Sequence, residues 1–187
     1  METSNVTSIS PRLRYSGSAA AGVSPLGKAD PADLAGIDIF RPLTPEQRRT
    51  VSDLGHEFLL PGDYVLGVHG SVGETLYSLL EGSAELSVPT SKGYLGVRTV
   101  RGGESVPLSI LFGEGKLITT AVTVGAVRSF AIPRSFLLRL CVTRPDIGVQ
   151  VYRTAAEVFG TRYAATLLKL IEAMDGAAPD AHLWTGA

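Results

Sequence analysis

Hydrophobic and polar positions follow one pattern in the middle of the chain and another near its end. Between residues 56 and 132, short runs rich in apolar and β-branched residues are separated by segments that contain glycine. The runs are HEFLL, YVLGV, TLYSLL, AELSV, YLGVRTV, TTAVTV and RSFAI. Many short strands with turns at close intervals are typical of antiparallel barrels, sandwiches and rolls. We therefore predict a mainly β domain over this region.

One helix is predicted before the strands and a short one after them. Thr44 and Gln47 have the spacing of a capping box, and Pro45 suits the first position of a helix. This combination predicts a helix over about 45–54. After the last strand, the pattern becomes helical over about 135–141.

A long helix is predicted from about residue 145 to Met174, with Asp175-Gly176 as its C-terminal stop. Its apolar residues recur at helical spacing, and Arg162 lies off that stripe. Such a length is unusual for a globular helix and favours packing against a second copy in a homodimer. The alternative is a helix that only covers the open edge of the β domain. The predicted dimer contacts are Val151, Ala155, Val158 and Phe159.

Size and composition divide the chain into one domain and two tails. The chain has 187 residues, which is enough for a single domain with its own core. Its first residues are rich in serine, alanine and glycine and show no periodicity. We predict a disordered N-terminal tail over 1–34, a folded domain over 35–174 and a flexible C-terminal tail over 175–187.

Charge and hydropathy argue against several partners. The net charge is −1, so no overall field attracts nucleic acid or an anionic membrane. No run approaches the roughly 18 apolar residues that a membrane-spanning helix needs. The first residues, METSNVTSIS, lack the apolar run of a signal peptide. We expect a soluble, cytoplasmic protein that binds neither nucleic acid nor membrane.

Residues with catalytic or metal-binding chemistry form no recognisable motif. His56, His69 and His182 are scattered and lack the spacing of metal ligands. Cys141 lies among leucines, which suggests a buried and unreactive thiol. The segment FGEGKL lacks the first glycine and the final Ser or Thr of a phosphate-binding loop. We predict no catalytic residue, no metal site and no cofactor.

Residues 58–86, FLLPGDYVLGVHGSVGETLYSLLEGSAEL, contain glycines and apolar residues in a specific order. These positions are Pro61, Gly62, Gly70, Gly73, Leu76, Tyr77 and Gly82. Together with IDIFRPLTPEQ before them and RSFAIPRSFLLRLCVTRPDIGVQVY after them, they make the chain resemble the cyclic-nucleotide-binding domain over 38–174. This is the family that includes bacterial catabolite-activator-type regulators. The resemblance implies an antiparallel, jelly-roll-like β-roll with flanking helices and a long C-terminal helix.

In those regulators, the long helix leads to a DNA-binding helix-turn-helix module. In this sequence only DGAAPDAHLWTGA follows Met174. The basic residues of the long helix are also interspersed with acidic ones, which is a poor pattern for binding phosphates. We therefore do not expect this chain to bind DNA by itself.

The resemblance also implies where a nucleotide would bind. In the family, the nucleotide lies in a cassette between two strands, where a Phe-Gly-Glu segment begins a short helix whose N–H groups favour phosphate. The Glu accepts the ribose hydroxyl, and an Arg just before a Thr-Ala pair binds the phosphate through its planar fork of donors. In this sequence, the only charged side chains between Glu104 and Arg128 are Glu114 and Lys116.

Two registers are possible for this cassette. In the first, which we favour, Ser105-Val106-Pro107 replaces Phe-Gly-Glu and 108–111 forms the short helix, so a proline replaces the ribose-binding carboxylate. In the second, Phe112-Gly113-Glu114 is the motif, but the segment up to Thr120-Ala121 is then several residues too short. Both registers put Thr119 at the position of the phosphate-binding arginine.

These substitutions lead to the functional prediction. Loss of the arginine removes a charge-assisted contact worth roughly 1.5–3 kcal/mol. We predict a non-enzymatic, stand-alone domain that has lost nucleotide binding and acts as a homodimeric scaffold or protein-interaction module, with an unidentified protein partner. The alternative is a ligand-gated sensor that binds a cyclic nucleotide or another small effector in the modified cassette. The candidate ligand-binding residues are Ser105, Val106, Pro107, Leu108, Ser109, Lys116, Thr119, Thr120 and Ala121.

Overall fold

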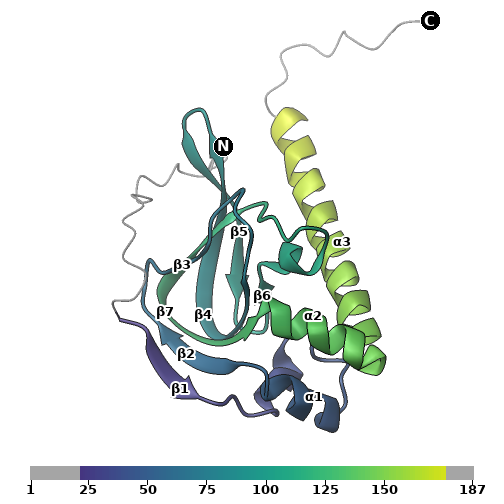
Figure 1. The fold of residues 1–187 in the computed structure, drawn as a ribbon. Coiled ribbons are helices and arrows are strands. Elements are labelled where there is room, and N and C mark those ends of the chain that lie inside the picture. The colour runs from purple at the N-terminus through teal and green to yellow at the C-terminus, as the bar shows by residue number, and fades with distance from the viewer. Residues whose placement is uncertain (1–21, 176–187) are drawn as a thin grey trace, which may run out of the picture.

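The computed structural model describes residues 22–175 (Figure 1). Seven antiparallel strands form one rolled sheet, with the helices beside it. The strands are β1 (Ser24–Gly27), β2 (His56–Leu60), β3 (Val65–Gly67), β4 (Thr75–Thr90), β5 (Gly93–Arg101), β6 (Ser105–Val106) and β7 (Thr120–Pro133). The α-helices are α1 (Pro45–Ser52), α2 (Arg134–Thr143) and α3 (Pro145–Asp175), and the 3-10 helices are η1 (Asp33–Gly36) and η2 (Leu108–Leu111). This architecture confirms the predicted β-roll with flanking helices and a long C-terminal helix.

The sheet has the order β1-β2-β7-β4-β5, with β3 paired to β7 and β6 paired to β4. Strands β4 and β7 each span two of the predicted runs, so the prediction of separate strands there was wrong. In β4 the register against β7 shifts on both sides of Glu81, and Gly82 has a φ of 88°. A bulge with a left-handed glycine bends a strand without ending its pairing. The bend lets β4 continue around the roll.

Order begins earlier in the chain than predicted. Strand β1 pairs with β2, and η1 buries Leu34 completely, although both lie wholly or partly within the predicted tail over 1–34. Residues 1–21 and 176–187, which include most of both predicted tails, lie outside the described residues. The prediction was wrong for residues 24–34, because their low apolar content hid a strand held by backbone pairing.

The predicted capping box is present at the start of α1. Thr44 Oγ1 accepts a hydrogen bond from the Gln47 backbone N–H at 3.2 Å, and the Thr44 backbone N–H donates to Gln47 Oε1 at 2.9 Å. These two bonds satisfy backbone groups that a helix end otherwise leaves free. Helix α1 ends at Ser52, two residues before the predicted limit.

Two apolar clusters hold the fold together. One joins the helices to the sheet and includes Leu34 from η1, Val51 from α1, Ile110 from η2, Leu137 from α2 and Val151 from α3. The other fills the interior of the roll and includes Leu66, Leu79, Leu86, Val100, Val106 and Ala121. Between residues 22 and 175, no helix is long and apolar enough to span a bilayer.

Helix α3 is fixed to the domain along its first half and extends past it in its second half (Figure 1). Val151 and Ala155 are completely buried in the chain's own core. Val158 and Phe159 pack against the same core, and the Phe159 ring lies 5.8 Å from the ring of Phe112. The four predicted dimer contacts therefore face this chain itself, because the apolar positions in the first half of the helix are its inward side.

Candidate functional site

The short helix of the candidate site is η2, which spans the four residues that the favoured register assigns to it. It follows β6, where Ser105 and Val106 pair with Ser78 and Tyr77 of β4. Helix η2 packs against α2, α3 and β4, and Ile110 is completely buried there. Because β6, η2 and the start of β7 are consecutive elements, the structure has a segment with the layout of the predicted cassette.

The polar groups of Ser105 are all used inside the chain. Its backbone N–H donates to Asp38 Oδ1 at 3.1 Å, and its carbonyl accepts from Arg162 Nη1 at 3.0 Å. Its hydroxyl shares a hydrogen bond with the Ser78 hydroxyl at 3.0 Å. Ser105 is completely buried, so it holds β6 in place and offers no free group to a ligand.

The wall of the cassette is apolar and filled. Val106 and Ala121 belong to the cluster inside the roll, and Pro107 and Leu108 are also buried. Leu117 occupies the space between two glycines: a Cβ on Gly67 would lie 2.4 Å from its side chain, and one on Gly73 would lie 2.6 Å from it. These glycines admit Leu117, whose side chain packs in the apolar cluster that joins the helices to the sheet.

The roll interior is also a poor environment for charge. Burial raises the pKa of Tyr77 well above that of a free tyrosine, and the neighbouring Tyr64 raises it further. Both rings pack against the apolar cluster of the roll. A buried charge needs a compensating partner, so an anionic group would require a cation in this space.

The remaining candidate residues do not supply that cation. Thr120 is buried, and its hydroxyl accepts from the His69 backbone N–H at 3.1 Å. Thr119, at the position of the arginine, is partly exposed. Lys116 forms an isolated bridge with Val72, and its exposed ammonium pairs with Glu114 at 3.1 Å. The cassette therefore lacks the guanidinium that the resemblance implies.

Ser109 differs from the other hydroxyl residues of the site. Its Oγ is buried and has no hydrogen-bond partner within residues 22–175. An unsatisfied buried hydroxyl costs free energy. Among the candidate ligand-binding residues, Ser109 is the one whose buried polar group has no partner in the described part of the chain.

Arg134 was not predicted as a site residue. It lies at the start of α2 and binds η2 and the turn that follows it. Its Nε donates to the Ile110 carbonyl at 2.7 Å, and its Nη2 donates to the Gly113 carbonyl at 3.2 Å. Carbonyls at the end of a helix lack partners within it, and an arginine can satisfy several of them. No local motif marks this role, because Arg134 is 24 positions away from Ile110.

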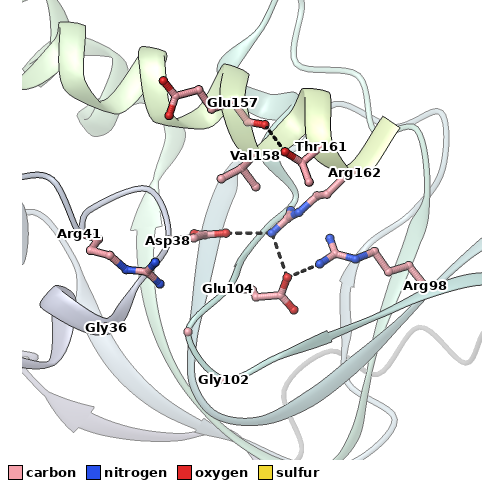
Figure 2. Close-up of a pocket in the computed structure, with 11 residues that line it drawn as sticks. Gly36, Asp38, Arg41, Arg98, Gly102, Glu104, Glu157, Val158, Thr161 and Arg162 are labelled. Atoms are coloured by element: carbon pink, nitrogen blue, oxygen red, sulfur yellow. Dashed lines mark hydrogen bonds and ion pairs between the residues drawn. The ribbon is translucent and has the colours of Figure 1, made fainter. Parts of the chain in front are cut away.

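A second cluster of polar side chains lies between the roll and α3 (Figure 2). Arg162 Nη2 lies 2.8 Å from Asp38 Oδ2 and 3.4 Å from Glu104 Oε1, and Arg98 also pairs with Glu104. The Arg162 and Asp38 side chains are only 16% and 13% exposed. Burial lowers the pKa of Arg162, Arg98 lowers it further, and the two carboxylates oppose the shift.

A pocket of about 480 Å3 opens beside this cluster. The loop after η1, strand β5 with the turn that follows it, and helix α3 form its walls. Figure 2 shows Arg41 approaching from one side and Arg98 from the opposite side, with Asp38 and Glu104 between them. Sequence reasoning missed this pocket entirely. In the described part of the chain, no group of three His, Cys, Asp or Glu side chains is placed to hold a metal ion.

Comparison with known proteins supports the fold. Neither a protein-family model nor a curated protein matches the sequence. Among solved structures, a cyclic nucleotide-binding domain from Methylobacillus flagellatus is similar with a TM-score of 0.71 and 18% identity, over 80% of this chain and 88% of that one. The chain has the fold of a cyclic-nucleotide-binding domain.

Further structures share this cyclic-nucleotide-binding-domain fold. A putative cyclic nucleotide-binding protein from Geobacter metallireducens has 23% identity and a TM-score of 0.64, over 72% of this chain and 98% of that one. The catabolite activator protein of Thermus thermophilus has 22% identity and a TM-score of 0.61, over 73% of this chain and 63% of that one. The fold is thus established, while the residues of the site decide function.

Proposed function

We propose that this chain is a non-enzymatic, cytoplasmic regulatory domain whose cassette has lost cyclic-nucleotide binding and which acts as a homodimeric scaffold or protein-interaction module. One observation carries the proposal. The segment from Ser105 to Ala121 has the layout of a nucleotide cassette, but its only cation is Lys116, which is exposed and paired with Glu114. Pro107 and Thr119 stand where a carboxylate and a guanidinium would be required, and neither can replace those groups.

The apolar wall of the cassette supports the same conclusion. Val106 and Ala121 belong to the buried cluster inside the roll, where an unpaired charge costs free energy. Since no arginine compensates that cost through a contact with the phosphate, we infer weak or absent nucleotide binding.

The test is a thermal-shift titration with cyclic AMP and cyclic GMP at millimolar concentration. We expect no change in Tm with either nucleotide. A ligand at 100 times its Kd would stabilise the fold by about 2.7 kcal/mol, which a melting curve detects easily. A saturating shift would reject the loss of nucleotide binding. In that case the variant Lys116→Gln would show whether the lysine binds the phosphate.

The homodimer is proposed from the face of α3 that residues 22–175 leave exposed. Val149, Tyr163 and Leu167 are exposed there by 64%, 60% and 39%. At 100° per residue, these three positions lie on the side opposite the buried Val151. We assign a second copy to this face, in place of the contacts predicted from the sequence, because an aligned apolar stripe on a long helix favours pairing with another helix.

The oligomeric state tests this part of the proposal. Analytical ultracentrifugation of the full chain is expected to give the mass of a dimer, and Leu167→Glu is expected to give the mass of a monomer. Ala165→Glu is the matched control, since this exposed position lies on the opposite side of α3. A monomeric wild type would reject the homodimer.

A sensor that binds a small, uncharged effector is the second candidate. The observation in its favour is Ser109 Oγ, which is buried without a partner in the described residues. A polar effector at η2 would satisfy this hydroxyl and would not need a cation. The nucleotide titration does not exclude it, so the Ser109 variant considered in the Discussion is its test.

A further inference from the structure

The second half of α3, residues 160–175, extends past the roll (Figure 1). The packing of the first half ends with Val158 and Phe159, which contact the core that joins the helices to the sheet. Among the later side chains of α3 whose surroundings the structure describes, Arg162 is the only one that is not exposed. In this described part of the second half, one side chain therefore provides the buried attachment to the domain.

Arg162 binds two segments that are distant in the sequence. Its Nη2 lies 2.8 Å from Asp38 Oδ2, in the loop after η1 (Figure 2), and its Nη1 donates to the Ser105 carbonyl of β6 at 3.0 Å. Asp38 also accepts from the Ser105 backbone N–H, at 3.1 Å. The contact with Glu104 is longer, at 3.4 Å, and Arg98 binds the same carboxylate oxygen. Asp38 and Ser105 are therefore the main partners of Arg162.

These contacts can separate while the first half of α3 stays packed. Arg162 and Asp38 line a pocket that opens to solvent, so both charges can regain water when they part. Val151 and Ala155 are completely buried, and their separation from the core would expose apolar surface. The attachment at Arg162 is thus easier to release than the packing of the first half.

Gly160 lies where such a release requires a flexible backbone. It directly follows Phe159, the last packed residue, and precedes Arg162 by two positions. A Cβ on Gly160 would have no neighbouring heavy atom within 4 Å, so packing among the described residues does not explain the glycine. Glycine weakens the interior of a helix relative to alanine, and sharp bends in helices occur at such residues. This position therefore permits α3 to bend between its two halves.

We propose that the second half of α3 is a movable segment, with Gly160 as its hinge and the Arg162 contacts as the latch that holds it on the domain. The latch is closed in this structure. Because its two main partners lie in the loop after η1 and in β6, a displacement of either segment opens it. Asp38 and Ser105 are hydrogen-bonded to each other, so both segments act on the latch together.

The latch has a consequence for the proposed dimer. The movable segment contains Tyr163 and Leu167, which belong to the exposed face assigned to a second copy. The closed latch fixes the direction of these side chains relative to the roll. This consequence rests on the proposed homodimer, whereas the hinge and the latch themselves do not.

The test is a distance measurement by double electron–electron resonance between spin labels at Leu168→Cys and Thr99→Cys, two exposed positions on α3 and β5. Burial raises the pKa of the Cys141 thiol to about 11, so this residue reacts slowly with the label at neutral pH. A bend of about 20° at Gly160 moves residue 168, about 12 Å further along the helix, by about 4 Å. Arg162→Gln is therefore expected to broaden or shift the distance distribution of wild type by about 4 Å.

Two further variants are the controls. Arg153→Gln makes the same substitution in the first half of α3, where the side chain is 72% exposed, and its distribution should equal that of wild type. Gly160→Ala combined with Arg162→Gln should restore a narrow distribution, because alanine stiffens the helix.

A second copy could restrain or confuse the measurement, so two precautions separate this proposal from the homodimer. Labelled full chain is diluted with an excess of unlabelled chain, which removes distances between copies. Each measurement is also repeated with Leu167→Glu, the variant expected to be monomeric.

Several results would overturn the proposal. An unchanged distribution in Arg162→Gln, with and without Leu167→Glu, would show that other contacts hold the second half of α3. Equal broadening in Arg153→Gln would indicate general loosening of the helix. Broadening that persists with Gly160→Ala would exclude Gly160 as the hinge. A loss of helical circular dichroism in Arg162→Gln would show that the end of α3 unfolds instead of bending.

Discussion

The two sides of Ser105 differ in chemistry. The side toward the roll interior, here called the inner side, is apolar, and the side toward α3, the outer side, is charged. On the inner side, Val106 and Ala121 belong to the apolar cluster that fills the roll, and the segment from Ser105 to Ala121 contains no arginine. On the outer side, Arg162 and Asp38 bind the backbone groups of Ser105 and belong to a network of charged side chains. Among the described residues, the charged network lies on the side of Ser105 that faces α3.

This difference separates the shape of a site from its binding chemistry. Gly67 and Gly73 permit the close approach of Leu117, so these glycines are explained by packing within the chain. A charged network has stricter requirements, because each buried charge must be paired. An apolar wall can therefore maintain the shape of a roll without any group that binds charge.

The largest expected effect is on the outer network. Asp38→Ala removes the carboxylate that pairs with Arg162 and leaves that guanidinium, only 16% exposed, with Glu104 as its remaining charged partner. Breaking a buried ion pair costs about 3–5 kcal/mol, and we expect the lower end because Glu104 remains. Denaturant unfolding of the variant measures this loss directly.

The exposed pair between Arg153 and Glu157 provides the control. These side chains are 72% and 61% exposed, so Glu157→Ala is expected to cost about 0.5 kcal/mol or less. If the free energy of unfolding fell by the same small amount in both variants, the outer network would contribute no more than an ordinary surface ion pair. The two sides of Ser105 would then not differ in energetic requirement.

An effect of comparable size is expected at Leu117, in the cassette segment. Leu117→Ala removes a side chain that is 3% exposed and leaves a cavity, which costs about 2–5 kcal/mol. Leu117→Met keeps the volume and should cost less than about 1.5 kcal/mol. Denaturant unfolding of both variants measures the losses.

The same alanine variant also distinguishes a filled site from a chemically altered one. We expect cyclic AMP to leave the Tm of Leu117→Ala unchanged, because extra space does not supply a phosphate-binding cation. Stabilisation of this variant by cyclic AMP would instead show that Leu117 alone prevents binding, and that backbone N–H groups can hold the phosphate.

Local patterns were sufficient to predict most of the fold. The capping box at Thr44 depends on neighbouring residues and is confirmed. The short helix over 108–111 was expected from the family resemblance, and η2 spans these residues. The continuity of β4 was missed, because glycine at position 82 ends some strands and bends others. The choice depends on whether a partner strand continues past the glycine, which the local sequence does not reveal.

The charged pocket could not have been predicted in the same way. Arg162 is 124 positions away from Asp38 and 58 away from Glu104. Its position off the apolar stripe made it look like an ordinary exposed residue of a long helix. The rolled sheet brings the loop after η1 and the turn after β5 beside α3, and only that arrangement turns three scattered charges into a network.

The smallest expected effect concerns the two serines of the cassette, and it differs in sign between them. Ser109→Ala removes a buried hydroxyl without a partner, so we expect the free energy of unfolding to rise by about 0.5–1 kcal/mol. Ser105→Ala is the matched control, since it removes a hydroxyl that is hydrogen-bonded to Ser78, and the free energy should fall by about 1 kcal/mol. Denaturant unfolding resolves differences of this size when both variants are measured beside wild type. A loss of stability in Ser109→Ala would mean that a bound molecule satisfies this hydroxyl in solution, and the inner side would then be a working site for an uncharged ligand.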